Sequence, residues 1–184
     1  TALAALPVPF QPVHLLFINL LTDSLPALAI GMEPAERDVL SEKPRNPKGG
    51  ILERRFMALL LGQGALIAVC TMISFEVGLK ESAALASTMA FATLTLARLF
   101  HGFNCRSRHS IVKIGFRRNR YSLGAFALGV LLLALVLFVP ALKPLFEVET
   151  MNGMQLGCVG VMAVLPTFVI QNFKVVGEVF DREK

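Results

Sequence analysis

The stretch "SLGAFALGVLLLALVLFVP" occupies residues 122–140 and decides the fold class. It carries no charged side chain and is long enough to cross about 30 Å of hydrocarbon as a helix. Four further apolar stretches lie at 13–32, 56–79, 83–103 and 152–173. Because a bilayer offers no water to backbone groups, each span must satisfy its own hydrogen bonds as a helix. We therefore predict an all-α fold, a polytopic transmembrane helix bundle of five spans.

The composition agrees with a membrane protein. Hydrophobic residues make up 54% of the chain and charged residues 17%, whereas soluble domains have about 45–50% and about 25%. The chain begins at Thr1 without a charged n-region or a cleavage site, so we expect no signal peptide. We interpret residues 1–184 as one transmembrane domain and as a piece of a longer polypeptide.

Positive charge alternates between the two sides of the predicted bundle. The loops 33–55 and 104–121 and the C-terminal end are rich in Lys and Arg, whereas the short loops near 80 and at 141–151 are not. The positive-inside rule places the basic loops and the C-terminus in the cytoplasm. The net charge of +5 is then an orientation signal, and we expect the lipid bilayer, and no nucleic acid, as a partner.

The first span contains an unusual polar octet, "NLLTDSLP", at residues 19–26. On an α-helix Asn19, Thr22 and Asp23 share one face, and an Asp at the bilayer centre costs roughly 2.5–3.5 kcal/mol. Pro26 removes a hydrogen bond and crowds the carbonyl four residues back, so we predict that the span is kinked or unwound near it. Oxygen atoms gathered in this way suit a hard cation such as Ca²⁺. The alternative is that these polar groups join helices, with Asp23 paired to a cation such as Arg98.

The octet and the loop after it carry a resemblance to a known family. "NLLTDSLPALAIGMEPAERDVLSEKPRNPKGGIL" (19–52) resembles the sixth transmembrane helix and following cytoplasmic loop of P-type cation-transporting ATPases, most closely the calcium-pump branch. The pattern NxxTDxxPA is matched by Asn19, Thr22, Asp23, Pro26 and Ala27, and the RxP signature by Arg45, Asn46 and Pro47. The later spans fit helices seven to ten by number and order.

The resemblance implies an ATP-driven pump that moves Ca²⁺ out of the cytoplasm. It implies that Asn19, Thr22 and Asp23 are metal ligands and that the fourth and fifth helices supply others. Helices one to five would belong to the same polypeptide, outside this chain. ATP and Mg²⁺ would be bound by cytoplasmic domains outside this chain, which has no catalytic residue of its own. A bacterial cytoplasmic membrane is the expected location.

Arg98 departs from the family pattern. Where muscle-type pumps place a Glu of the eighth helix in their first ion site, this sequence aligns Arg98, a permanent cation that cannot ligate another. One hypothesis is that Arg98 fills that site as a counter-charge near Asp23, so that one Ca²⁺ moves per cycle. The other is that its side chain extends to the membrane surface.

Alternatives remain open at other positions. Glu33, Glu36 and Asp38 in the loop suggest cation access from the cytoplasm or domain coupling, or else a solvated loop face with local ion pairs. Gly62-Gln63-Gly64, in mid-span, favours close helix packing over a ligand role, and His14 lacks metal-ligand spacing. The whole protein is alternatively a pump for Na⁺/K⁺ or Mg²⁺, or a structural or accessory membrane subunit without transport.

Overall fold

Five helices of the predicted kind are present in the computed structural model, which describes residues 6–34, 54–107, 109–115 and 118–182. Within these ranges the helices long and apolar enough to cross a membrane are Pro12–Gly31, Phe56–Leu79, Ala83–Asn104, Arg120–Phe138 and Gly153–Glu178. The predicted five-span bundle is therefore confirmed. The last span differs most, because its helix continues beyond the predicted end at 173.

The described residues contain nine helical elements. They are α1 (Pro12–Phe17), the π-helix η2 (Ile18–Asp23), α2 (Ser24–Gly31), α3 (Arg54–Leu79), α4 (Ala83–Asn104), α5 (Ile111–Ile114), α6 (Arg120–Phe138), α7 (Lys143–Phe146) and α8 (Gly153–Arg182). All but the short helices α5 and α7 belong to the spans. The first span is thus α1, η2 and α2 in direct succession. The other four spans are single helices.

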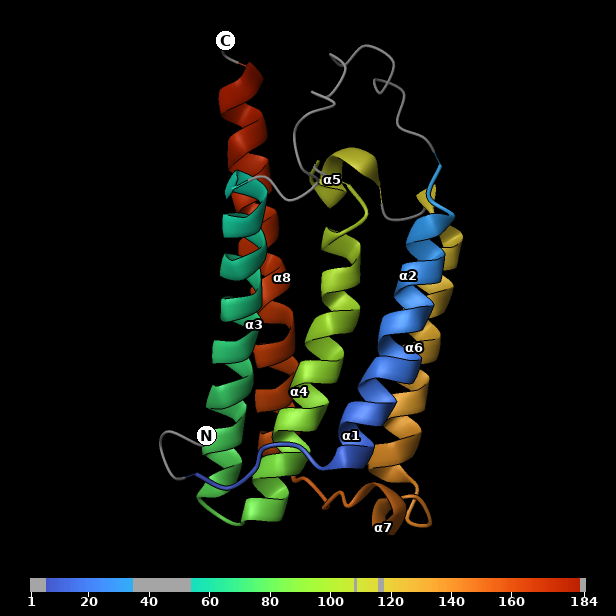
Figure 1. Ribbon diagram of the computed structural model, residues 1–184, viewed down its shortest axis with the longest axis vertical. Coiled ribbons are helices and arrows are strands. Elements are labelled where there is room, and N and C mark those ends of the chain that lie inside the picture. The colour runs from blue at the N-terminus through green and yellow to red at the C-terminus, as the bar shows by residue number, and fades with distance from the viewer. Residues whose placement is uncertain (1–5, 35–53, 108, 116–117, 183–184) are drawn as a thin grey trace.

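Helix α4 is the centre of the bundle. It contacts α3 and α8 on one side and η2, α2 and α6 on the other (Figure 1). Its span is 67% buried, against 17–28% for the other four. Four alanines on α4 are fully buried, namely Ala86, Ala90, Ala92 and Ala97, and such small residues let helices approach closely. The remaining helices use α4 as a common scaffold.

The connecting segments lie at the two ends of the helix bundle. The C-terminal end of α2, the start of α3, α5 and the C-terminal end of α8 lie together at one end, which we call the α5 end (Figure 1). The N-terminal segment, the α3–α4 turn and α7 lie at the other, the α7 end. The chain therefore crosses the bundle in alternating directions, as the alternating loop charge predicts.

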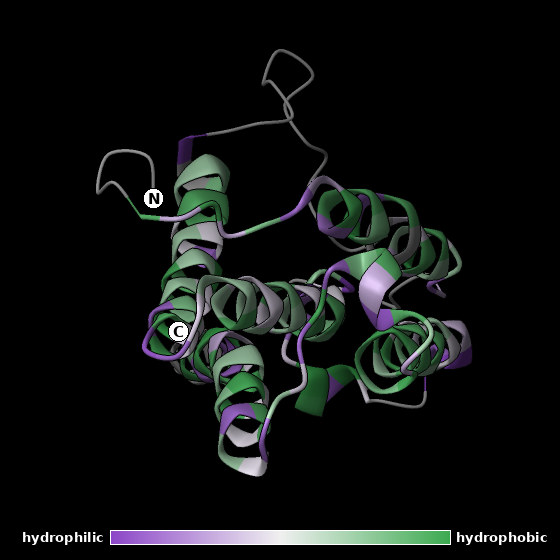
Figure 2. Cartoon of the chain, turned by 90° about the horizontal axis from the view of Figure 1, so that it is seen from below, coloured by the Kyte–Doolittle hydropathy of each residue, from purple (hydrophilic) through white to green (hydrophobic). Residues whose placement is uncertain are grey.

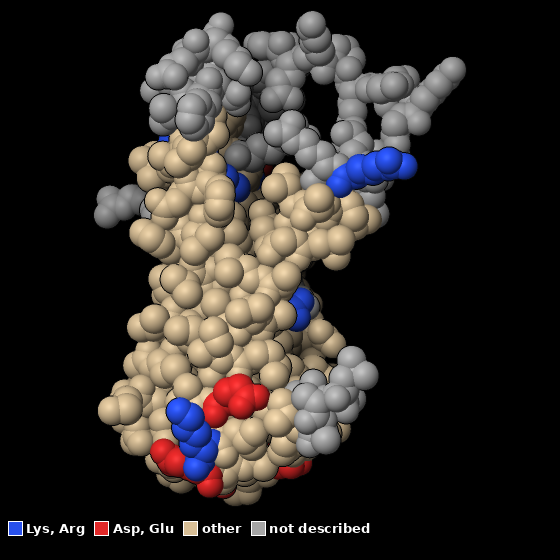
Figure 3. All heavy atoms as spheres, turned by 90° about the vertical axis from the view of Figure 1, so that its left-hand side faces the viewer, with Lys and Arg blue, Asp and Glu red and all other residues tan. Residues whose placement is uncertain are grey.

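The surface between the two ends is apolar. Many large hydrophobic side chains of the spans are exposed, among them Leu61, Leu131 and Phe168. Seen end-on, the helices are mostly hydrophobic in colour, and hydrophilic colour is concentrated in the connecting segments and helix ends (Figure 2). On the face shown in Figure 3, charged side chains lie toward the two ends, and the belt between them is almost free of charge. Because lipid is as apolar as the bundle interior, such outward-facing hydrophobic residues are the expected pattern.

Candidate cation site

The polar octet lies on the one irregular stretch of the first span. Residues Ile18–Asp23 form the π-helix η2, flanked by regular helix on both sides. Pro26 itself lies in the regular helix α2, and the irregular stretch, a π-helix, ends three residues before the proline. A kink or unwinding at Pro26 stays a prediction. Isolated π-helical turns inside α-helices are rare and often mark functional sites. Pro26 accounts for part of the disturbance, because it cannot donate the regular hydrogen bond to the carbonyl four residues back.

Pro26 also fixes how the first span packs. Its ring lies against Gly102 of α4, where an added Cβ would stand 3.4 Å from the proline Cβ. Nearer the α7 end, His14 stacks on Phe91 of α4, with ring centroids 4.3 Å apart. These two contacts mean that η2 runs beside the intervening part of α4, which contains Thr95 and Arg98.

Asn19 lies on the face of η2 that turns away from the bundle. Its neighbours Phe17 and Ile18 are buried at 5% and 1% exposure, whereas Asn19 and Leu20 are exposed. An amide at membrane depth has no water to bond and requires a polar partner. Asn19 is therefore placed to accept a ligand or another helix rather than to join the helices of this chain. The side chains of Thr22 and Asp23 lie outside the description.

The other predicted site residues are placed as follows. Arg98 is half-buried on α4, the helix that packs against η2, so its predicted pairing with Asp23 stays a prediction. Glu36 and Asp38 lie outside the described residues. No three His, Cys, Asp or Glu side chains among the described residues come together as a metal site, so a cation held at η2 needs further ligands.

Thr95 is a polar group near η2 that the sequence analysis did not single out. Its hydroxyl is fully buried, and within the described residues it has no hydrogen-bond partner. By contrast, the Thr71 and Thr88 hydroxyls each donate to the carbonyl four residues back, at 2.9 and 3.0 Å. Thr95 therefore lacks the hydrogen bond from its hydroxyl to the carbonyl four residues back, and it lies on the stretch of α4 beside η2.

A buried polar cluster holds the inner end of the first span at the α5 end. Arg106, just after α4, donates from Nε to Glu33 Oε2 at 2.9 Å and from Nη2 to Glu33 Oε1 at 3.0 Å. The two side chains are only 2% and 13% exposed. Asn119 Nδ2 donates to the same Glu33 Oε2 at 2.7 Å and to the Ala29 carbonyl at 2.8 Å. We call Glu33, Arg106 and Asn119 the inner clamp.

The inner clamp bears out the local ion pair that one alternative expected for Glu33 and corrects its predicted solvent exposure, because the side chain is 13% exposed. Both carboxylate oxygens of Glu33 are occupied by Arg106 and Asn119. Burial by itself would raise the pKa of Glu33, but the hydrogen bonds from Arg106 and Asn119 and the nearby positive charges outweigh it and hold the pKa below its ordinary value. Glu33 is therefore ionised and structural at neutral pH.

This pKa predicts how stability depends on acid. A carboxyl group with a lowered folded pKa stabilises the fold fully above its unfolded pKa, and the contribution is lost as pH falls through the folded value. The melting-temperature advantage of the full-length protein over its Glu33→Gln variant should be constant near neutral pH and shrink below about pH 4. Thermal unfolding in detergent across pH measures this, and an advantage that persists undiminished in acid would contradict it.

The loop that carries Arg106 is itself attached to α8. Lys174 Nζ donates to the carbonyls of Asn104 and Ser107 at 2.7 and 2.6 Å, and so occupies free carbonyls at the end of α4. Further along α8, Glu178 accepts from the backbone N–H and the hydroxyl of Ser110, at 2.6 and 2.8 Å. Lys174 therefore fixes the end of α4 and the stretch that carries Arg106, whereas Glu178 fixes the separate, later stretch at Ser110.

The start of the first span is held at the α7 end by His14, which is fully buried. The Gln11 backbone N–H donates to His14 Nδ1 at 3.2 Å, and Nε2 lies 2.7 Å from the Phe146 carbonyl. Both bonds form only if Nε2 carries the proton and the ring is neutral. Phe17 packs edge-on against Phe91 and Phe146 beside it. We call this set around His14 the outer anchor.

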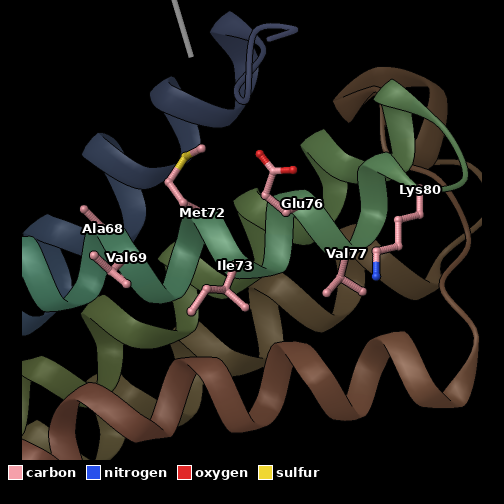
Figure 4. Close-up of a pocket in the computed structure, with 7 residues that line it drawn as sticks. All are labelled: Ala68, Val69, Met72, Ile73, Glu76, Val77 and Lys80. Atoms are coloured by element: carbon pink, nitrogen blue, oxygen red, sulfur yellow. The ribbon is translucent and has the colours of Figure 1, made fainter. Parts of the chain in front are cut away.

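Two shallow grooves lie on the outer surface. One runs along α3 and is lined by residues of that helix and by Lys80 directly after it, with Glu76 and Lys80 near one end (Figure 4). The other lies on α2 and is lined by Ser24, Ala27, Leu28, Gly31 and Met32. Each groove is formed by one helix, so neither encloses a ligand. The groove on α2 nevertheless begins directly after η2 and extends its open face.

The fold and this site define an integral, multi-pass membrane protein whose first span carries a polar, π-helical segment. The sequence profile described as "Cation transporting ATPase, C-terminus" matches residues 7–176. The chain belongs to this family and corresponds to the C-terminal region of its members.

The curated relatives are all much longer than this chain. A "Calcium-transporting ATPase" of Bacillus subtilis is 39% identical over 171 residues, which cover 91% of this chain and 19% of the relative. "Calcium-transporting ATPase 1" of Lactococcus lactis is 38% identical over 95% of this chain and 20% of the relative. "Calcium-transporting ATPase type 2C member 2" of rat is 34% identical over 82% and 16%. This chain thus spans about a fifth of their length.

Proposed function

We propose that this chain is the membrane C-terminal part of an ATP-driven pump that exports Ca²⁺ from the cytoplasm. Its first span supplies part of the intramembrane ion site through Asn19, Thr22 and Asp23. The observation that carries this proposal is the π-helix at Ile18–Asp23, which presents the exposed amide of Asn19 at membrane depth. Transporters commonly bind ions at irregular stretches of their membrane helices, and single π-helical turns inside α-helices often occur at functional sites.

The relatives' names and the ligand chemistry support calcium as the cargo. Ca²⁺ takes six to eight oxygen ligands at about 2.3–2.6 Å, and the octet offers a carboxylate, an amide, a hydroxyl and backbone carbonyls. Other helices of the same polypeptide would complete the shell at the open face of η2 and α2. ATP and Mg²⁺ would be bound by cytoplasmic domains outside this chain, so the chain hydrolyses nothing by itself.

The same reasoning proposes an orientation. The α5 end carries the loops rich in Lys and Arg, and the positive-inside rule places them in the cytoplasm. The C-terminus would then be cytoplasmic, and the α7 end, with the outer anchor, would face outside. The bacterial relatives support a bacterial plasma membrane as the location.

The test is transport by the full-length parent protein in membrane vesicles. We expect ATP-driven uptake of radioactive calcium that a large excess of Mg²⁺, Na⁺ or K⁺ does not displace. Uptake of another cation in place of calcium would assign the protein to a different branch of the family. No ATP-driven uptake of any of these cations would favour the accessory role.

The number of ions per cycle follows from Arg98. If the guanidinium of Arg98 occupies the place of a ligand, it blocks one of two ion sites, because a cation repels another cation. A single Ca²⁺ then binds at the remaining site. Calcium-binding isotherms on the purified full-length protein should therefore saturate at one ion per polypeptide. Saturation at two would remove Arg98 from the site and favour its extension to the membrane surface.

A further inference from the structure

We propose that the first span is clamped at both ends, so that its π-helix is maintained by the bundle, and that Glu33 is the positioning residue of the inner end. Glu33 does not touch the ion; it acts through α2, which joins it to η2. The part of this proposal that concerns ion binding rests on the proposed function. The part that concerns the geometry of the helix is independent of that function.

The inner clamp prevents α2 from sliding or turning. Asn119 bonds both the Glu33 carboxylate and the Ala29 carbonyl in the last turn of α2. Its Oδ1 also accepts from the Ser122 N–H at 3.0 Å and so caps α6. One buried side chain therefore joins the end of the first span to the start of α6. The two bonds from Arg106 to Glu33 add a charged attachment to the loop that Lys174 fixes to α8.

The outer anchor restrains the other end of the span in a comparable way. His14 is bonded to the Phe146 carbonyl at the end of α7 and stacked on Phe91 of α4. It fixes both the height and the rotation of α1, because a hydrogen bond and a stacked ring tolerate little displacement. Between the two attachments lies η2, whose Asn19 and Leu20 face outward.

Clamping two ends has a specific consequence for the segment between them. A π-helical turn holds more residues than an α-helical turn, so conversion of η2 to regular α-helix must rotate or shift one end of the span. The inner clamp and the outer anchor oppose both movements. The geometry of the backbone at Asn19–Asp23 is thus imposed by tertiary contacts at the two ends of the span. Removing the contacts of Glu33 should therefore make the backbone at Asp23, ten residues away, more mobile.

The test compares Glu33→Gln with Glu178→Gln in the full-length protein. Both changes replace a carboxylate that accepts hydrogen bonds at the α5 end with an amide of the same shape. Only Glu33 is attached to the first span, whereas Glu178 holds Ser110 to α8. Glu178→Gln therefore controls for a general loss of stability at this end.

The first readout is backbone hydrogen exchange, which needs no assumption about the ion. We expect amides of residues 18–31 to exchange about tenfold faster in Glu33→Gln, the size of one lost charge-assisted hydrogen bond. Glu178→Gln should leave them unchanged. Exchange at 18–31 that equals wild type in Glu33→Gln, or that rises equally in both variants, would overturn the proposal.

The second readout separates ion affinity from turnover. In Glu33→Gln the calcium concentration for half-maximal uptake should rise about tenfold, while the maximal rate per folded protein stays within about twofold of wild type. An unchanged half-maximal concentration would mean that Glu33 only stabilises the fold. If wild type moves no calcium, the proposed function fails, and the exchange measurement still decides whether the clamp exists.

A double variant tests the pairing itself. Arg106→Gln alone leaves the Glu33 carboxylate buried without its main cation, and each single change leaves one unmatched group. The effect of Glu33→Gln with Arg106→Gln on exchange at 18–31 should therefore be smaller than the sum of the two single effects. Additive effects would show that the two residues act independently and would contradict the clamp.

Discussion

Asp23→Asn should abolish ATP-driven calcium uptake by the full-length protein at the calcium concentrations that half-saturate the wild type. The substitution keeps the size and shape of the side chain but replaces a charged ligand by a neutral one. The affinity of calcium sites is tuned over several orders of magnitude by the number of charged ligands. We therefore expect a rise of at least about a hundredfold in the calcium concentration for half-maximal uptake. Vesicle uptake measured with radioactive calcium, at matched protein amounts, detects this loss.

Glu149→Gln is the matched control. Glu149 is an exposed carboxylate at the α7 end, where it accepts a hydrogen bond from Ser82 at 3.0 Å. An exposed contact of this kind contributes little, so uptake should stay near the wild-type rate. If Asp23→Asn retained uptake as fully as Glu149→Gln does, the octet would serve to join helices, and the proposed ligand set would be wrong.

The spans could be predicted from the sequence because hydrocarbon imposes a length and an apolar composition on every crossing segment. Pro166 lies inside the uninterrupted helix α8, so a proline alone does not decide where a helix becomes irregular. An irregularity near Pro26 was expected because a proline removes one helical hydrogen bond. Its form was not predictable. Whether a disturbed helix kinks, unwinds or widens into a π-helix depends on what holds its ends, and those contacts come from distant residues.

The inner clamp shows why such contacts leave no sequence signal. Glu33 is 73 residues from Arg106 and 86 from Asn119. In its local sequence, each of the three is an ordinary polar residue near a membrane surface. His14 reads as an isolated histidine, yet its partner is the carbonyl of Phe146, 132 residues away. A backbone carbonyl exists at every position, so no pattern of residue types could have identified this one.

The glycines are a second case in which the sequence does not reveal which residues make the tertiary contacts. The sequence favours close packing at Gly62 and Gly64, but both are exposed, and nothing in the described part of the chain lies within 4 Å of a Cβ added there. Close contact occurs instead at Gly78 and Gly129. Small residues permit helices to approach, but which glycine is used depends on where the helices cross.

Gly78→Ala should prevent the α3–α4 pair from forming in its present geometry. An added Cβ would stand 2.6 Å from Ala86 Cα and 2.8 Å from Ala86 N, both backbone atoms that no side-chain rotation can move. The Gly78 carbonyl also accepts the N–H groups of Glu81 and Ser82 in the turn between the two helices. Relief therefore requires moving α4, the scaffold of the whole bundle. We expect a loss of about 3 kcal/mol or more of stability, at the upper end for overpacked sites.

Gly129→Ala is the comparison that isolates this cause. Its added Cβ would also stand 2.6 Å from a neighbour, but that neighbour is Cδ2 of Leu99, the end of a flexible side chain. Leu99 can change rotamer, so the cost should be near 1 kcal/mol. Folded yield and melting temperature of the two full-length variants in detergent measure the difference. Equal losses would mean that α4 yields as easily as a leucine side chain, and that it is not the rigid element on which the first span and its clamp depend.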